Sequence, residues 1–422
     1  MQGSPAVADR ARARADSEPQ PPPVRASEGG ALRLAVDATP LLGERTGVGT
    51  FTSCALEALG ARPDLDVRAF AVSWRRRGGV VPHLPGGVSF LDRAMPARPL
   101  HWAWRRMDGP TLEWWTGPLD VVHGTNFVVP PTRHAARVVT VHDLTTVHFP
   151  ALCNAATLRF PAMVKRALAR GAWVHTPSRF VAAEVVELLG ADPDRVRAVH
   201  HGVPTVAGAG PTEPSRQAER PGASPPAGPG PASRRYVLAL GTIEPRKDLP
   251  SLVRAFDAVA AERPDLELVV AGPDGWGVGA FTAAVDAAAH RGRIRRLGWL
   301  DGPERDRLLR GAHVFAYPSL YEGFGLPPLE AMGVGVPVVT TTAGAVPEVV
   351  GDAAVLVPVG DVDALAGALA RVVDDTDLRR RLVERGRQRV ASFSWQACAE
   401  GLAGLYESAA SAASGASGRD RS

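Results

Sequence analysis

Glu322 and Glu330 are two carboxylates with seven residues between them, and their surroundings give them different tasks. Residues 313–319 are a β-branched and aromatic run that predicts a buried strand, and a glycine-rich turn follows. Glu322 is therefore expected on the loop at a strand's carboxyl end. Two prolines after that loop suit a first helical turn, so Leu329 and Glu330 are expected to begin a helix. Near that start, backbone donors and a carboxylate can hold nucleotide hydroxyls and phosphates. Open α/β sheets bind ligands at such places.

Arg246 and Lys247 form a second chemical feature, between a predicted strand at residues 236–241 and a predicted helix. Positive charge at a helix start opposes the helix dipole. A functional role therefore explains the two residues better than their being a solvent-exposed pair of cations does. A leaving nucleoside diphosphate develops negative charge, which a metal-free enzyme must meet with cations and helix dipoles. Each charge-assisted hydrogen bond of this kind is worth about 1.5–3 kcal/mol.

The first half of the chain places a glycine pair and a histidine at comparable positions. Gly47 and Gly49 lie in a predicted loop, residues 46–50, between the first predicted strand, residues 32–38, and a predicted helix that begins at Phe51. Glycines there let the backbone approach a ligand closely. Taken alone, such a pair is better explained by a tight turn, and its position after the first strand is what favours a ligand-binding loop. His142 ends the predicted strand at residues 137–143, at the edge where parallel strands meet their ligands.

Strands and helices alternate in two runs, and these are the elements that must position the candidate residues. Each run predicts a doubly wound, Rossmann-like α/β domain. A Pro-, Gly- and Ser-rich segment between the runs cannot bury a core and is predicted to link the domains. The predicted divisions are a disordered tail at 1–30, an N-terminal acceptor domain at 31–204, the linker at 205–235, a C-terminal donor domain at 236–395, a last helix crossing back to the first domain at 396–413, and a disordered tail at 414–422.

Composition limits the classes of function that the chain can have. Its 422 residues suffice for two domains, and its 48 basic and 44 acidic residues leave a formal charge of only +4. We therefore expect no nucleic-acid partner. The three cysteines are scattered without metal-ligand or disulfide spacing, and the N-terminal stretch lacks the apolar core of a signal peptide. We predict a cytoplasmic protein that does not span a membrane.

Residues 317–340 resemble the E-x(7)-E signature of the retaining glycosyltransferases of family 4, and the resemblance extends over residues 32–413. It implies the GT-B fold, in which two Rossmann-like doubly wound domains face each other across a cleft. The segments around Arg246 and Glu322 look most similar to mannosyltransferases that use GDP-mannose.

The resemblance also implies a role for each candidate residue. Glu322 corresponds to the carboxylate beside the donor sugar near its anomeric centre, and Glu330 to the one that binds the nucleotide ribose. Arg246 and Lys247 correspond to the cations that bind the diphosphate. His142 matches the histidine that contacts the donor sugar, and we count it with Glu322 as catalytic. The expected donor-binding set is completed by the loop residues Gly47, Gly49, Phe324, Gly325 and Leu326.

We predict a retaining transferase that moves a hexose from a nucleotide sugar to a hydroxyl of a glycan or glycolipid, with mannose from GDP-mannose as the best guess. Such enzymes are thought to react by front-face attack, in which the departing phosphate takes the acceptor proton and no dedicated base is needed. A UDP-sugar donor is the main rival. An epimerase or phosphorylase on the same fold is a second rival, and a catalytically silent GT-B subunit that recruits a partner is a third.

Asp64 and Asp66 have the spacing of a D-x-D metal site, but they precede their strand, at the wrong edge of a parallel sheet for a ligand. We therefore expect neither a metal nor any other cofactor, since the nucleotide sugar is a co-substrate. Residues 74–77 and 99–115 mix arginine with tryptophan, as segments that lie on anionic membranes or meet a lipid-linked acceptor do. An exposed loop and a core-packed helix explain them equally well, so contact with the inner face of the cell membrane stays an open question.

Overall fold

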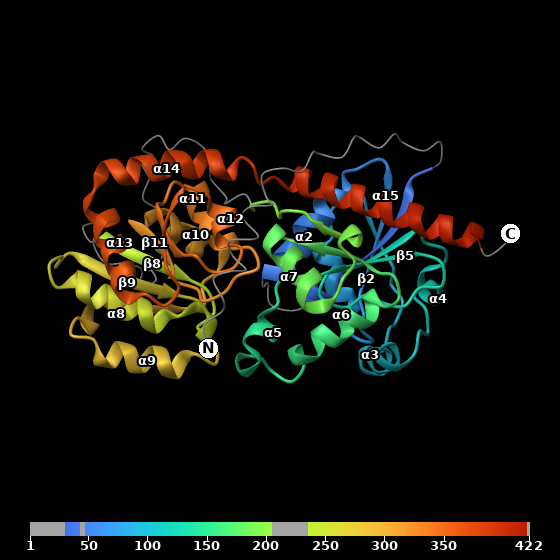
Figure 1. Cartoon of the computed structure of the whole chain (residues 1–422), viewed down its shortest axis with the longest axis horizontal. Helices are drawn as coiled ribbons and strands as arrows, with labels where there is room; N and C mark the ends of the chain where they lie inside the picture. The colour runs from blue at the N-terminus through green and yellow to red at the C-terminus, as the bar shows by residue number, and fades with distance from the viewer. Residues whose placement is uncertain (1–29, 43–46, 205–234, 420–422) are drawn as a thin grey trace, which may run out of the picture. The chain divides into compact units, whose positions relative to one another are not determined.

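The computed structural model describes residues 30–42, 47–204 and 235–419. These residues form two compact units. The first unit ends at Gly202 and also takes in the chain from Phe393 onward, whereas the second runs from Val203 to Ser392. The last helix, α15 (Trp395–Arg419), therefore belongs to the first unit (Figure 1).

The predicted tail at residues 1–30 and the predicted linker at 205–235 lie almost entirely outside the described residues. The predicted C-terminal tail at 414–422 is described in part, and residues 414–419 continue helix α15. The prediction that the last helix ends at residue 413 is therefore wrong. The residues beyond 413 are mostly Ala, Ser and Gly, which carry no apolar periodicity that would extend a helix by pattern.

The first unit is built on one parallel sheet of seven strands in the order β3-β2-β1-β4-β5-β6-β7. The strand order reverses between β1 and β4, as in doubly wound folds. The strands are β1 (Leu32–Asp37), β2 (Leu65–Phe70), β3 (Val88–Phe90), β4 (Val121–Gly124), β5 (Ala136–Thr140), β6 (Trp173–Thr176) and β7 (Val196–Ala198).

Helices cover both faces of this sheet, which is why its strands are apolar on both sides. Val36 of β1 and Val138 of β5 pack with α2 and α15 on one face of the sheet. On the opposite face, Ala35 of β1 packs with α3, and Val139 of β5 packs with α6 and α7. The alternation follows from the period of two along a strand. The helices are α2 (Gly47–Gly60), α3 (Ala97–Arg106), α4 (Glu113–Thr116), α5 (Thr145–His148), α6 (Phe160–Leu168), α7 (Arg179–Leu189) and α15, with short 3-10 helices η1 (Thr39–Leu42), η2 (Arg77–His83), η3 (Pro150–Leu152), η4 (Thr157–Arg159) and η5 (Pro193–Arg195).

A buried chain of hydrogen bonds ties α15 to the sheet. His123 Nδ1 lies 2.7 Å from the Tyr406 hydroxyl, and its Nε2 lies 2.7 Å from Thr140 Oγ1. Thr140 Oγ1 lies 2.9 Å from His175 Nδ1, and His175 Nε2 lies 3.1 Å from the Val199 carbonyl. Because a carbonyl only accepts, His175 carries its proton on Nε2, and each earlier group in turn donates toward His175, beginning with the Tyr406 hydroxyl.

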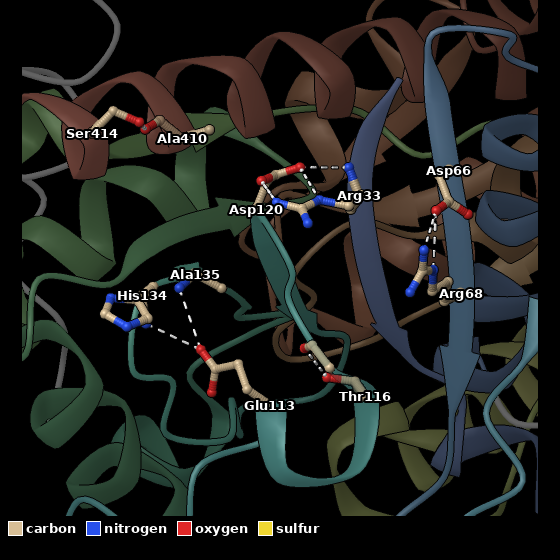
Figure 2. A network of polar contacts seen from close by, with 11 residues as sticks. Arg33, Asp66, Arg68, Glu113, Thr116, Asp120, His134, Ala135, Ala410 and Ser414 are labelled. Carbon is tan, nitrogen blue, oxygen red and sulfur yellow. Dashed lines mark hydrogen bonds and ion pairs between the residues drawn. The ribbon is translucent and has the colours of Figure 1, made fainter. Parts of the chain in front are cut away.

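Ion pairs and backbone hydrogen bonds fix the edge of the sheet where β1 and β4 begin (Figure 2). Arg33 donates from Nε and Nη2 to the two carboxylate oxygens of Asp120 at 3.0 and 2.6 Å. Glu113 Oε1 accepts from the backbone N–H groups of Arg133 and His134 at 2.7 and 3.1 Å, which holds the turn that leads into β5.

The second unit contains a parallel sheet of six strands in the order β10-β9-β8-β11-β12-β13. The chain enters this sheet at β8, and the strand order reverses between β8 and β11, which are parallel neighbours. The strands are β8 (Arg235–Leu240), β9 (Leu266–Ala271), β10 (Ile294–Gly298), β11 (Val314–Tyr317), β12 (Val338–Thr341) and β13 (Ala354–Val357).

The core of this unit lies where α8 and α13 pack together on the sheet (Figure 1). Phe256 of α8 and Leu369 of α13 are fully buried there against Val270 of β9 and Ala316 of β11. The helices are α8 (Leu249–Ala260), α9 (Val278–Ala287), α10 (Gly302–Gly311), α11 (Leu326–Gly333), α12 (Val346–Val350), α13 (Val362–Asp374) and α14 (Thr376–Val390), with 3-10 helices η6 (Pro245–Lys247) and η7 (Arg291–Arg293).

Two predicted helix starts are wrong by a few residues. Helix α2 begins at Gly47, so the glycine pair lies in its first turn, whereas the prediction placed the pair in a loop that ends before Phe51. Helix α11 begins at Leu326 and not at Leu329. In both cases glycine or proline occupies the first turn, where helical geometry is compatible with residues that usually signal a loop. Among the described residues, no helix combines the length and apolar composition needed to cross a bilayer.

Candidate active site

Glu322 forms ion pairs with both predicted cations. Its Oε2 lies 2.7 Å from Arg246 Nη1, and its Oε1 lies 2.6 Å from Lys247 Nζ. Arg246 and Lys247 lie on η6, which follows β8, and Glu322 lies on the loop after β11. Since β8 and β11 are parallel neighbours, their carboxyl ends reach the same edge of the sheet and bring the three residues together.

Tyr317, the last residue of β11, also holds Lys247. The ammonium donates to the Tyr317 hydroxyl at 2.7 Å and lies 4.6 Å from the centre of the tyrosine ring. Burial and the negative charge of Glu322 raise the pKa of Tyr317, so the hydroxyl stays protonated. Lys247 is thus fixed by a carboxylate and by a neutral hydroxyl from the same strand and loop.

Charge compensation within the cluster sets the protonation of Glu322. Burial alone would raise the pKa of this carboxyl, but the positive charges of Arg246 and Lys247 lower it to about 2. Burial lowers the pKa of Lys247, an effect that the charge of Glu322 opposes. Arg246 pairs with Glu244 as well, at 2.8 Å. Two cations and two carboxylates therefore balance in the ligand-free protein.

The backbone around Glu322 has little freedom. Gly344 passes so close that a Cβ atom there would lie 2.3 Å from the Glu322 carbonyl oxygen, and its φ of 55° also favours glycine. Ala345 N–H donates to the same carbonyl at 2.9 Å. On the other side, Gly325 has a φ of 105° at the start of α11, and Phe324 is buried.

Glu330 is buried and forms an ion pair with Arg305 of α10. It is the fifth residue of α11, not a residue of the first turn as predicted, because the helix starts earlier. Burial raises the pKa of Glu330, while the guanidinium of Arg305 opposes that shift. This carboxylate therefore depends on Arg305 for its charged form.

His142 lies in the first unit, just after β5, and its Nε2 donates to the Thr125 carbonyl at 2.8 Å. Burial lowers the pKa of His142, so the ring is neutral near pH 7 with Nδ1 as an acceptor. The ring packs edge-on against Phe51, one turn into the helix that Gly47 starts. No atom lies within 4 Å of a Cβ placed on Gly47, so the described chain itself does not demand glycine there.

The structure brings Glu322, Arg246 and Lys247 into direct contact, and it places Phe324, Gly325, Leu326 and Glu330 on the loop and helix that follow Glu322. His142, Gly47 and Gly49 belong to the other unit. Asp64 and Asp66, excluded as a metal site, pair with Arg62 and Arg68, respectively, at the start of β2.

Sequence reasoning missed five residues that shape these sites. Tyr317 had a signal, since it lies in the predicted strand that leads into the glutamate loop. Glu244 and Arg305 had none, because charged residues near turns and on helices are common. Gly344 could be recognised only once the backbone of Glu322 was placed. Asp37 ends β1, accepts hydrogen bonds from Thr39, and has its pKa raised by burial to about 6.

Two family models match the chain, one described as Glycosyltransferase Family 4 over residues 46–207 and one described as Glycosyl transferases group 1 over residues 226–389. The O-antigen chain mannosyltransferase B of Escherichia coli is 31% identical over 296 residues, which are 68% of this chain and 74% of that protein. The chain belongs to the family 4 glycosyltransferases. This glycosyltransferase is a hexosyltransferase enzyme.

The name of a second relative states which donor that enzyme uses. The GDP-mannose-dependent monoacylated alpha-(1-6)-phosphatidylinositol monomannoside mannosyltransferase of Corynebacterium glutamicum is 34% identical over 173 residues, which are 39% of the glycosyltransferase and 45% of that protein. Among solved structures, sucrose-phosphate synthase of Thermosynechococcus elongatus matches with a TM-score of 0.66 at 20% identity, covering 90% of this chain and all of that one. The two parallel sheets are those of the GT-B fold.

Proposed function

We propose that this glycosyltransferase moves mannose from GDP-mannose, with retention of configuration and without a metal, to a hydroxyl of a glycan or glycolipid. The observation that carries the proposal is the cluster that buried Glu322 forms with the partly buried Arg246 and Lys247 at the carboxyl ends of β8 and β11. Ligands of open parallel sheets bind at that edge, where the strand order switches.

Arg246 and Lys247 are the groups that would meet the diphosphate. As the bond between sugar and phosphate breaks, charge builds on the departing oxygen, and fixed cations stabilise that charge without reorganising. In the ligand-free protein both cations already have carboxylate partners, so a diphosphate must share them with Glu322 and Glu244. Tyr317 keeps the ammonium in place during this exchange.

Glu322 would face the sugar with a permanent negative charge. Its pKa of about 2 keeps it ionised at every pH at which the enzyme would work. A carboxylate in that position can accept hydrogen bonds from sugar hydroxyls and can stabilise the positive charge that develops at the anomeric carbon. Because it is ion-paired and fully ionised, it is suited to this electrostatic role and not to donating a proton.

Glu330 would accept hydrogen bonds from the ribose hydroxyls, with Phe324, Gly325 and Leu326 forming the loop against the donor. Arg305 would keep the Glu330 carboxylate charged and oriented. In the first unit, His142 would use its acceptor nitrogen, Nδ1, toward a sugar hydroxyl, and the first turn of α2 with Gly47 and Gly49 would approach the donor through its backbone.

The choice of mannose is supported by the two relatives, which are both mannosyltransferases, and a UDP-sugar is the rival donor. A catalytically silent subunit is the rival from another class. A thermal-shift screen of the purified protein with GDP-mannose, UDP-glucose, UDP-GlcNAc, GDP and UDP separates them. We expect stabilisation by GDP-mannose and GDP that persists in the presence of a chelator.

Stabilisation by UDP and its sugars instead would identify a UDP-sugar as the donor and leave the assignment of the site unchanged. Loss of the thermal shift on chelation would contradict metal independence. The absence of any shift, in a protein that unfolds cooperatively, would favour the silent subunit.

A further inference from the structure

A pocket of about 460 Å³ opens in the first unit between α3, α6 and the loop after β4. Arg137, the second residue of β5, lines it and lies near the strand's amino end, whereas His142 follows that strand's carboxyl end. The pocket is therefore at the opposite edge of the sheet from the residues proposed to meet the donor. Its volume is in the range that holds a small molecule.

The pocket wall is strongly positive. Five arginines and a single carboxylate, that of Asp108, line it. Asp108 forms ion pairs with two of the arginines. The other three make no ion pair with any described residue. The arginines of the pocket are Arg105, Arg137, Arg159, Arg166 and Arg170.

Arg166 has a buried donor that no described group satisfies. Its Nε donates to the Trp104 carbonyl at 3.0 Å, which fixes the direction of the guanidinium, but its Nη2 is buried and makes no hydrogen bond within the described chain. A buried donor without an acceptor is unfavourable, more so when it is charged, and native proteins rarely retain one without reason. An acceptor oxygen supplied by a ligand in the pocket would satisfy it.

The remaining wall is apolar. Trp104, Val129, Leu158 and Met163 are among its lining residues, and Leu158 is 43% exposed at the pocket. Trp102, on the same helix as Trp104, is half exposed and lies under the Arg106 guanidinium. A matching ligand has an anionic group next to an apolar one.

We propose that this pocket binds a phosphate group that is carried on an apolar moiety. Guanidinium groups match phosphate oxygens with paired hydrogen bonds, and the excess of cations over carboxylates suits a group with more than one charge. A neighbouring hollow of about 280 Å³ shares Arg137 and Arg170 and adds Arg133 and Arg195, which extends the positive surface. The phosphate can come from a lipid headgroup or from a soluble phosphate ester.

The test uses the full-length protein and four probes: hexyl phosphate, inorganic phosphate, phosphatidylcholine vesicles, and the same vesicles containing phosphatidylglycerol. Binding is measured by calorimetry for the soluble probes and by co-sedimentation for the vesicles. Two variants address the pocket, Arg166→Met and the exposed Arg159→Glu. Arg93→Glu is the matched control, because Arg93 is exposed in the same unit and does not line the pocket.

We expect hexyl phosphate to bind more tightly than inorganic phosphate, and each pocket variant to weaken that binding about tenfold or more. Arg93→Glu should bind like the wild type. Binding of hexyl phosphate identifies a soluble ester as a sufficient source. Binding to the anionic vesicles alone, lost in both pocket variants, identifies a lipid headgroup, and both results support the site.

Three results overturn the proposal. One is the absence of binding to every probe, and another is equal affinity for hexyl phosphate and inorganic phosphate. The third is binding that Arg159→Glu leaves unchanged or that Arg93→Glu weakens as much. Since Arg159 is exposed, its variant remains informative if Arg166→Met fails to fold. An unchanged GDP thermal shift in Arg159→Glu confirms that the protein is folded.

Discussion

At Glu322, one buried carboxylate forms ion pairs with two cations that the proposed reaction needs. The arrangement can be understood as preorganisation: the cations stand in position before the donor arrives, and the carboxylate that holds them would also face the sugar. Its consequence is that turnover should fall, whereas GDP binding should not weaken, when the charge of Glu322 is removed.

Glu322→Gln should lower turnover by about two to three orders of magnitude, because the negative charge proposed to face the anomeric carbon is lost. The affinity for GDP should stay the same or rise, since Arg246 and Lys247 no longer pair with a competing carboxylate. Single-turnover kinetics and calorimetry with GDP measure the two effects. Glu244→Gln is the matched control, since it also pairs with Arg246, and its turnover should fall much less.

Turnover in Glu322→Gln equal to that of the wild type would show that Glu322 is not a catalytic residue. GDP affinity falling in parallel with turnover would instead show that Glu322 mainly maintains the shape of the site.

At Glu330 the partner is a single arginine. Burial raises the pKa of this carboxyl and Arg305 opposes the shift, so Arg305→Met should raise the pKa further. The neutral acid predominates below its pKa, so as the pH is lowered from 8 the GDP affinity of the variant should begin to decline at a higher pH than that of the wild type. Calorimetry with GDP over this pH range is the measurement. Parallel pH profiles would contradict the role of Arg305.

At the scale of elements, helix α15 is attached to the first sheet by the hydrogen bonds that run from Tyr406 through His123 and Thr140 to His175. All four side chains are buried, so no water replaces a missing partner. Tyr406→Phe keeps the ring and removes the hydroxyl that donates to His123. The first unit should lose about 1–3 kcal/mol of stability.

Chemical denaturation followed by far-UV circular dichroism measures this loss. A variant as stable as the wild type would mean that the His123 nitrogen finds another donor when the hydroxyl is absent.

Elements were predicted from the sequence more fully than their ends. Alternating β-branched runs specify the strands because both faces of each sheet are covered, and the glycine loop between β11 and α11 was recognisable from residue types alone. The starts of α2 and α11 were not, since glycine and proline carry the same signal in a loop and in a first turn. The contact between Glu322 and the η6 cations could not be predicted, because it depends on β8 and β11 being neighbours in space.

At the scale of the whole molecule, the two units should differ in their response to acid. The first unit buries His123, His175 and His201, and burial lowers the pKa of each, to about 3 for His175. A histidine whose folded pKa is depressed stabilises the fold above its unfolded pKa of about 6.5 and loses that contribution as pH falls toward the folded value. Asp37 acts oppositely, because its pKa is raised to about 6.

We therefore expect the first unit to lose stability between pH 6.5 and 4, ahead of the second unit. Hydrogen exchange followed by mass spectrometry at pH 7, 6 and 5, corrected for the intrinsic pH dependence, measures it separately in the two units. The second unit contains two histidines, His290 and His313, neither of them fully buried, and should change less. Equal loss of protection in both units would contradict the argument.

The most direct test of the central claim is a proton NMR time course of the purified enzyme with GDP-mannose in the presence of EDTA, recording the anomer of the mannose released by slow hydrolysis. We expect α-mannose as the first product, at a rate that EDTA does not change and that Lys247→Ala and Glu322→Gln each lower by about two orders of magnitude or more. First-formed β-mannose would contradict retention, a rate abolished by EDTA would contradict metal independence, and undiminished release by both variants would contradict the assigned site.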